Sequence, residues 1–131
     1  MATQERPLSP HLDVYRWQIQ MATSILHRIT GIVLSFGALI IAVGLLTLML
    51  GAEHWSCFTD IAGAWYGKLF MFVWTWCAAY HLCNGIRHIV QDFGHGFSIP
   101  AFKRNGWLSV IGSLVITALI WAYVLTTGGA V

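Results

Sequence analysis

Long apolar stretches separated by short polar segments make up most of this chain. Residues 31–50 and 106–129 contain no charged side chain, and residues 69–86 contain His81 but no Asp, Glu, Lys or Arg. A helix needs about 20 apolar residues to cross a bilayer, where backbone groups find no water to bond. The pattern therefore predicts an all-α integral membrane chain with three transmembrane helices, at about 21–50, 66–90 and 106–127. We expect residues 1–131 to form a single membrane-anchor domain, with 1–20 as a short N-terminal segment.

The composition agrees with burial in lipid. Of the 131 residues, 57% are hydrophobic and only 9% are charged, which is too little charge to cover the surface of a soluble domain. The net charge of +2 argues against a nucleic-acid partner. The three cysteines, Cys57, Cys77 and Cys83, form no CxxC pair, so we expect free thiols and no disulfide framework.

The distribution of Lys and Arg predicts the orientation in the membrane. Three arginines lie on the N-terminal side, and three basic residues lie between the second and third spans: Arg6, Arg16, Arg28, Arg87, Lys103 and Arg104. The opposite side carries only Lys68. Cytoplasmic loops are enriched in Lys and Arg, so we expect a cytoplasmic N-terminus and a periplasmic C-terminus. The first sixteen residues are polar, include Glu5 and Asp13, and lack an apolar run, so we interpret them as a mature N-terminus without a targeting peptide.

Polar side chains recur on one face of the first predicted helix. Ser24, His27, Arg28 and Gly31 follow the spacing i, i+3, i+4, i+7, and Ser35 lies one step farther along. Ionisable groups at membrane depth are costly and therefore indicate function. A hydroxyl and a guanidinium on one face suit hydrogen bonds to a quinone carbonyl or to carboxylates. The alternative is that Arg28, like Arg87, only extends to lipid phosphates.

A second stripe follows the second predicted helix. Its members are His81, Asn84, Gly85, His88 and Asp92. An imidazole in an apolar interior is a suitable axial haem ligand, and Gly85 one turn away would let a flat ring approach the backbone. His81 lies about 9 Å inside the cytoplasmic end of its helix, the same side from which Arg28 enters, so both stripes can belong to one site. His88 lies nearer the interface, where haem propionates would emerge. The alternative for His81 is a hydrogen bond between helices.

Two sequence segments accompany the first two predicted spans. The first is Arg-Pro-Leu-Ser-Pro-His-Leu at 6–12, followed by Ser-Ile-Leu-His-Arg-Ile-Thr-Gly at 24–31. The second is His-Leu-Cys-Asn-Gly-Ile-Arg-His at 81–88, closed by Asp-Phe-Gly at 92–94. Together they resemble the cytochrome b subunit that anchors succinate dehydrogenase, complex II. One departure is Gln91, where the family has a large apolar or aromatic residue, and we interpret it as a surface variation.

The resemblance implies roles for particular residues. His81 matches the axial ligand of haem b. Ser24 and Arg28 match residues that line the ubiquinone site. There, the resemblance implies that Ser24 donates a hydrogen bond from its hydroxyl and that Arg28 places a cation beside the quinone carbonyl. His27, Arg28 and His88 match positions near the haem propionates. The chain would then take part in electron transport and the tricarboxylic acid cycle without oxidising succinate itself.

The resemblance also implies three partners: a second small membrane-anchor subunit, an iron–sulfur subunit, and a flavoprotein subunit that carries FAD. The residues themselves favour a partner, because a low-spin b-type haem takes two axial ligands and only His81 lies at a suitable depth. We expect the second ligand to come from another chain, since His27 lies near the interface and is not expected to bend inward. The Ser-Pro-His-Leu stretch resembles bacterial members close to the mitochondrial type, so we expect the bacterial inner membrane rather than the mitochondrial one.

Other functions remain open from the sequence. One alternative is a cofactor-free anchor whose polar stripes serve helix association. Another is the anchor of a menaquinone-linked fumarate reductase, because the direction of electron flow depends on the quinone and on partner subunits. A small transporter is disfavoured, since three spans without an inverted repeat or a broken helix offer little for alternating access.

Overall fold

Four α helices make up the described part of the chain, which in this computed structural model comprises residue 14 and residues 16–127. They are α1 (Ile19–Leu50), α2 (Ala52–Gly63), α3 (Trp65–Asp92) and α4 (Ile99–Thr126). The all-helical prediction is confirmed for these residues, and α2 is an addition to the three helices expected. By length and composition, α1 and α4 qualify as candidate membrane spans. The motif at 6–12, including Arg6, lies outside the described residues.

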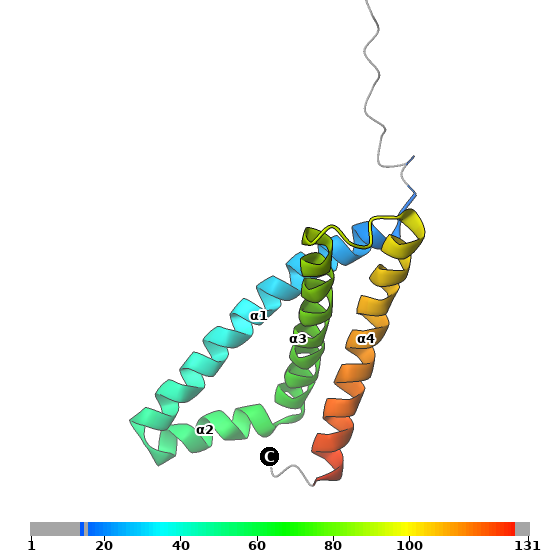
Figure 1. Ribbon diagram of the computed structural model, residues 1–131. Coiled ribbons are helices and arrows are strands. Elements are labelled where there is room, and N and C mark those ends of the chain that lie inside the picture. Colours follow the sequence, from blue (N-terminus) through cyan, green and yellow to red (C-terminus); the bar gives the residue numbers. More distant parts are fainter. Residues whose placement is uncertain (1–13, 15, 128–131) are drawn as a thin grey trace, which may run out of the picture.

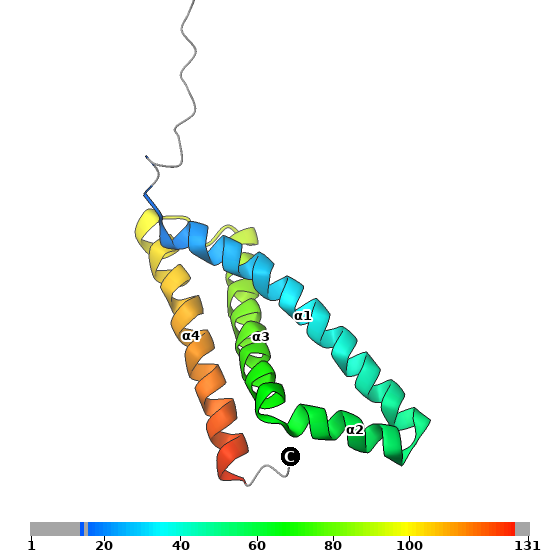
Figure 2. The same cartoon turned by 180° about the vertical axis from the view of Figure 1, so that it is seen from behind.

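The helices form an open triangle rather than a parallel bundle (Figure 1). α3 and α4 lie side by side, and α1 crosses them obliquely near its N-terminal end. Towards its C-terminal end α1 diverges from α3, and α2 bridges the gap, as the view from behind also shows (Figure 2). The start of α1, the end of α3 and the start of α4 therefore meet at one end of the molecule.

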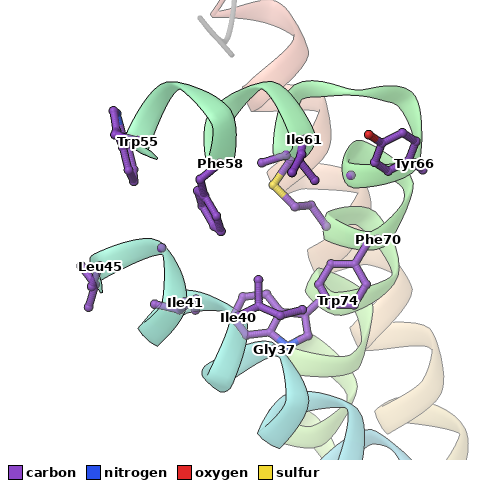
Figure 3. Close-up of a pocket in the computed structure, with 14 residues that line it drawn as sticks. Gly37, Ile40, Ile41, Leu45, Trp55, Phe58, Ile61, Tyr66, Phe70 and Trp74 are labelled. Carbon is purple, nitrogen blue, oxygen red and sulfur yellow. The ribbon is translucent and has the colours of Figure 1, made fainter. Parts of the chain in front are cut away.

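The helix α2 follows directly after a sharp turn at Gly51. This glycine has φ 116°, a conformation that side-chain-bearing residues rarely adopt, and it ends α1. One face of α2 carries Trp55 and Phe58, which point towards α1 (Figure 3). Glu53 and Asp60 of the same helix are exposed. With 12 residues α2 is too short to cross a bilayer. Its two-sided character is typical of a helix that lies in the membrane interface.

The last helix starts earlier than its predicted membrane span. α4 begins at Ile99, ahead of the expected start near 106, after a loop that turns through Gly94 and Gly96 with φ of 82° and 81°. Pro100 lies in the first turn, where its missing N–H would have no helical partner in any case. Lys103 and Arg104 are exposed there. The charged residues that bounded the predicted span are thus part of the helix itself.

Small and polar residues make the contacts between helices. Cys77, Ala79 and Tyr80 are the buried hydrophobic residues of the described part, whereas its large apolar side chains are mostly exposed. α1 buries four residues at intervals of seven: Thr23, Thr30, Gly37 and Gly44. α4 buries a row of four residues at intervals of three or four: Gly106, Ser109, Ser113 and Thr117. This distribution is typical of membrane helices, whose interfaces use small residues. Cys57, Cys77 and Cys83 are free thiols, as expected.

Arg87 joins three helices at the end where they meet. Its Nη1 donates hydrogen bonds to Thr23 Oγ1 (3.2 Å) on α1 and to Asn84 Oδ1 (3.1 Å) on its own helix. Its guanidinium also lies over the ring of Phe102 on α4, 4.6 Å from the centroid. Tyr80 adds a hydrogen bond from its hydroxyl to the Thr23 carbonyl at 2.9 Å. Arg87 is only 7% exposed, so the alternative that it extends to lipid phosphates is wrong.

Replacing Gly37 by alanine should weaken the contact between α1 and α3. A Cβ at this position would overlap the indole of Trp74, a rigid side chain on the neighbouring helix. Overpacking of this kind costs about 1–3 kcal/mol, so we expect Gly37→Ala to lower the melting temperature of the detergent-solubilised protein. Gly63→Ala is the matched control, because a Cβ there meets nothing within 4 Å. Equal melting temperatures for both variants would contradict this packing.

Replacing Arg87 by methionine should also destabilise the protein. The change keeps an unbranched side chain but leaves the oxygens of Thr23 and Asn84 buried without this donor. An unsatisfied buried polar group costs about 1–3 kcal/mol. We expect a clear fall in melting temperature for Arg87→Met and little change for Arg104→Met, since Arg104 is exposed. A similar fall for both would mean that the loss of a positive charge, and not the buried network, is responsible.

Candidate functional site

Three histidines gather where α1 begins and α3 ends. The ring of His27 stacks on the ring of His81, with centroids 3.9 Å apart and an interplanar angle of 11°. The ring of His88 lies 5.2 Å from His27, tilted by 55°, and its Nε2 accepts a hydrogen bond from the Asn84 amide at 3.2 Å. The two polar stripes expected from the sequence therefore meet. The expectation that His27 stays away from the interior is wrong, because its position on α1 faces α3.

The environment of His81 leaves one ring nitrogen available. Nδ1 lies 3.3 Å from Oγ1 of Thr30, while Nε2 has no hydrogen-bond partner among residues 16–127. Gly31 makes room for the ring, since a Cβ there would lie 3.2 Å from His81 Cε1. One turn along α3, a Cβ at Gly85 would meet nothing within 4 Å. The chain thus leaves open space at Gly85, one helical turn from His81, where a flat macrocycle could approach the backbone.

Ser24 and Arg28 lie on the open flank of α1. Both are exposed, whereas His27 between them is half-buried against α3. Neither side chain forms a hydrogen bond with another described residue, and Ser35 bonds only to the carbonyl of Gly31, at 3.0 Å. The structure therefore brings His27, His81 and His88 together but leaves Ser24 and Arg28 beside this cluster, facing outward.

The donor set fits a haem iron better than a bare metal ion. No group of three His, Cys, Asp or Glu side chains able to hold a metal ion occurs in the described ranges. A haem iron, in contrast, needs only an axial nitrogen from this chain. Nδ1 of His27 and Nε of Arg87 are buried without a hydrogen-bond partner at the same end. Buried polar atoms are nearly always paired, so a group from outside this chain is expected to meet them, and carboxylates such as haem propionates suit both.

Gln91 also belongs to this buried polar end. It is 8% exposed, and its Nε2 is buried without a partner in the described part of the chain. The interpretation of Gln91 as a surface variation is therefore wrong. Gln91 follows the buried residues Asn84 and Arg87 at intervals of seven and four, so it lies on the inner face of α3, which extends almost to the end of the helix at Asp92.

A separate cavity of about 460 Å³ lies at the other end of the molecule, between α1, α2 and α3 (Figure 3). Its walls are hydrophobic and aromatic, with Phe58 reaching in from α2 and Trp74 from α3. The sequence does not reveal this cavity, because it exists only where α2 folds back over the gap between α1 and α3. With so few polar groups in its walls, it lacks the donors that fix the orientation of a polar head group.

This chain is similar to known proteins over most of its length. It is 39% identical to the succinate dehydrogenase cytochrome b556 subunit of Rickettsia felis over 117 residues, which cover 89% of this chain and 91% of the relative. It is 34% identical to the subunit of the same name from Paracoccus denitrificans, over 87% of this chain and 88% of the relative. The mitochondrial succinate dehydrogenase cytochrome b560 subunit of Sus scrofa is 38% identical, over 87% of this chain and 71% of its own length.

The family described as "Succinate dehydrogenase/Fumarate reductase transmembrane subunit" matches residues 2–120. This match includes all four helices up to the last turns of α4, and with it the histidine cluster and the flank with Ser24 and Arg28. The chain therefore belongs to the family of transmembrane subunits of succinate dehydrogenase and fumarate reductase.

Proposed function

We propose that this chain is the membrane-anchoring cytochrome b subunit of a succinate:ubiquinone oxidoreductase, where it holds haem b through His81 and contributes to the ubiquinone-reduction site. The observation that carries the proposal is the meeting of His27, His81 and His88 at one end of the molecule, with Ser24 and Arg28 open beside them. The names of the relatives, which are cytochrome b subunits of succinate dehydrogenase, support it. The family description also includes fumarate reductase, and these names favour the succinate-oxidising direction.

In this proposal, His81 binds the haem iron through Nε2. The bound haem supplies a one-electron store close to the quinone. His27 and His88 bind the propionates, and Arg28 adds a positive charge beside them. His27 is stacked face to face on His81 with ring centroids 3.9 Å apart, which leaves no room for a porphyrin between the two imidazoles. A second axial ligand would therefore come from the other membrane-anchor subunit. The buried Nδ1 of His27 has no hydrogen-bond partner among the described residues, which supports its proposed contact with a propionate.

Ser24 and Arg28 bind the head group of ubiquinone. Ser24 donates a hydrogen bond to a carbonyl oxygen, and Arg28 stabilises the negative charge that develops on the quinone oxygen as it is reduced. A fixed cation in a poorly solvated site is well suited to this electrostatic task. Ubiquinone takes two electrons from a cluster of the iron–sulfur subunit, together with two protons. Since both side chains are exposed on this chain, neighbouring subunits complete the pocket.

Three of the four helices cross the bilayer in this proposal: α1, α3 and α4. The polar residues of α3 are turned inward, with Asn84 at 0% and Arg87 at 7% exposure, whereas its exposed side chains include Leu82 and Ile86. This supports α3 as a span although its composition is less apolar than that of α1 and α4. α2 lies in the interface on the far side, and the Lys and Arg residues favour a cytoplasmic N-terminus.

The proposed assembly places the chain beneath a flavoprotein subunit and an iron–sulfur subunit, which oxidise succinate with FAD and iron–sulfur clusters. This chain anchors them to the lipid bilayer and takes no part in succinate oxidation. We propose the bacterial inner membrane as its location, supported by similarity to proteins of Rickettsia and Paracoccus.

Replacing His81 by leucine should abolish or strongly disturb the b-type haem spectrum of the purified complex, because the axial nitrogen is removed. The measurement is a reduced-minus-oxidised difference spectrum together with the haem content per complex. His54→Leu is the control, since His54 is exposed on α2 at the opposite end. An unchanged spectrum in His81→Leu would favour an anchor without haem ligation by this residue.

Replacing Arg28 by leucine should impair ubiquinone reduction while leaving succinate oxidation largely intact. Without the cation beside the quinone oxygen, we expect ubiquinone reduction to fall by about 100-fold or more, as on removal of a comparable electrostatic donor. Succinate oxidation measured with soluble dyes should be largely retained. Arg104→Leu, an exposed cation at the same end, should leave both rates near those of the parent. Unchanged quinone reduction in Arg28→Leu would remove this residue from the site.

A further inference from the structure

Thr30 of α1 lies against the imidazole of His81 and is almost completely buried, with 1% exposure. Its Oγ1 lies 2.8 Å from the carbonyl oxygen of Leu26 and 3.0 Å from that of His27, both on its own helix. The same oxygen lies 3.3 Å from Nδ1 of His81 on α3. One hydroxyl therefore links the backbone of α1 to the side chain proposed as haem ligand.

The position of the protons follows from counting donors. A hydroxyl carries one hydrogen, and the two backbone carbonyls near Thr30 can only accept, so its hydrogen is directed to them. Towards His81 the Thr30 oxygen can then only accept a hydrogen bond. Nδ1 of His81 must be the donor, and in the neutral imidazole this leaves the lone pair on Nε2.

We propose that Thr30 is the positioning residue of the haem ligand: its hydroxyl accepts a hydrogen bond from Nδ1 of His81, which fixes the ring and presents Nε2 to the iron. This inference rests on the proposed function of His81. Ligating histidines generally donate their second ring N–H to such an acceptor, which sets the tautomer and increases the basicity of the ligand. Gly31 assists, because its missing side chain leaves the space that the fixed ring occupies.

The proposal has a consequence that a purely structural role of Thr30 would not have. Loss of the acceptor makes the imidazole a weaker electron donor, which stabilises ferrous relative to ferric iron. The midpoint potential of the haem should therefore rise. Haem affinity should fall by about 10–100-fold, the usual effect of losing the outer partner of a ligating histidine.

The test compares Thr30→Val, which keeps the shape but removes the hydroxyl, with Thr30→Ser, which keeps the hydroxyl, in the purified complex. Thr117→Val is the matched control, because Thr117 is also buried and its hydroxyl bonds only to the Ser113 carbonyl of its own helix. Haem content, midpoint potential and the electron paramagnetic resonance spectrum of the oxidised haem are measured. If Thr30→Val does not assemble, Thr30→Ala takes its place.

We expect a raised midpoint potential and easier haem loss in Thr30→Val, with Thr30→Ser and Thr117→Val close to the parent. Parent-like values in Thr30→Val, or equal changes in Thr30→Val and Thr30→Ser, would overturn the inference, provided that His81→Leu loses the haem. If His81→Leu instead keeps its b-type spectrum, the proposed ligand fails, and the role of Thr30 fails with it. The two failures are therefore distinguishable.

Discussion

A polar group taken out of water needs a hydrogen-bond partner, which lipid does not offer, and this constraint accounts for the polar contacts between the described helices. Arg87 is the clearest case, because a buried guanidinium is tolerated only when the protein satisfies it. Here it bonds to Thr23 and Asn84 and lies over Phe102, so one charge holds three helices together. Most large apolar side chains of the described part are exposed, whereas Asn84, Arg87 and Gln91 are buried at the end where the helices meet.

The contacts between helices differ at the two ends of the molecule. At the end with the histidines, hydrogen bonds and stacked rings connect α1 to α3, and they place His27 against His81. At the other end, glycines of α1 receive aromatic rings, with Gly37 under Trp74 of α3 and Gly44 under Phe58 of α2. Hydrogen bonds have direction and fix orientations, whereas apolar contacts do not. Only the first end therefore provides a defined geometry for a ligand.

Much of the fold follows from the sequence, because an apolar run of sufficient length permits only a helix in lipid. The helices α1 and α3 thus fall close to the ranges 21–50 and 66–90. Spacing along one helix also indicates which side chains share a face, which is why the His27 and His81 stripes were expected to meet. It does not reveal the crossing angle between helices. The burial of Arg87, the inward turn of His27 and the fold-back of α2 all depend on that angle.

Three polar groups without a hydrogen-bond partner among the described residues lie close together on α1. Arg28 is exposed, and in the proposed span a cation at its position must reach the interface or be covered by another chain. Its helical neighbour Ser24 is exposed on the same flank, while Nδ1 of His27, between them in sequence, is buried and unpartnered. If Arg28 only extended to lipid phosphates, there would be no reason for an exposed Ser24 and an unpartnered His27 Nδ1 beside it. The proposed boundary with a partner subunit and its ligands would account for all three, which is why we propose that the complex is completed at this flank of α1.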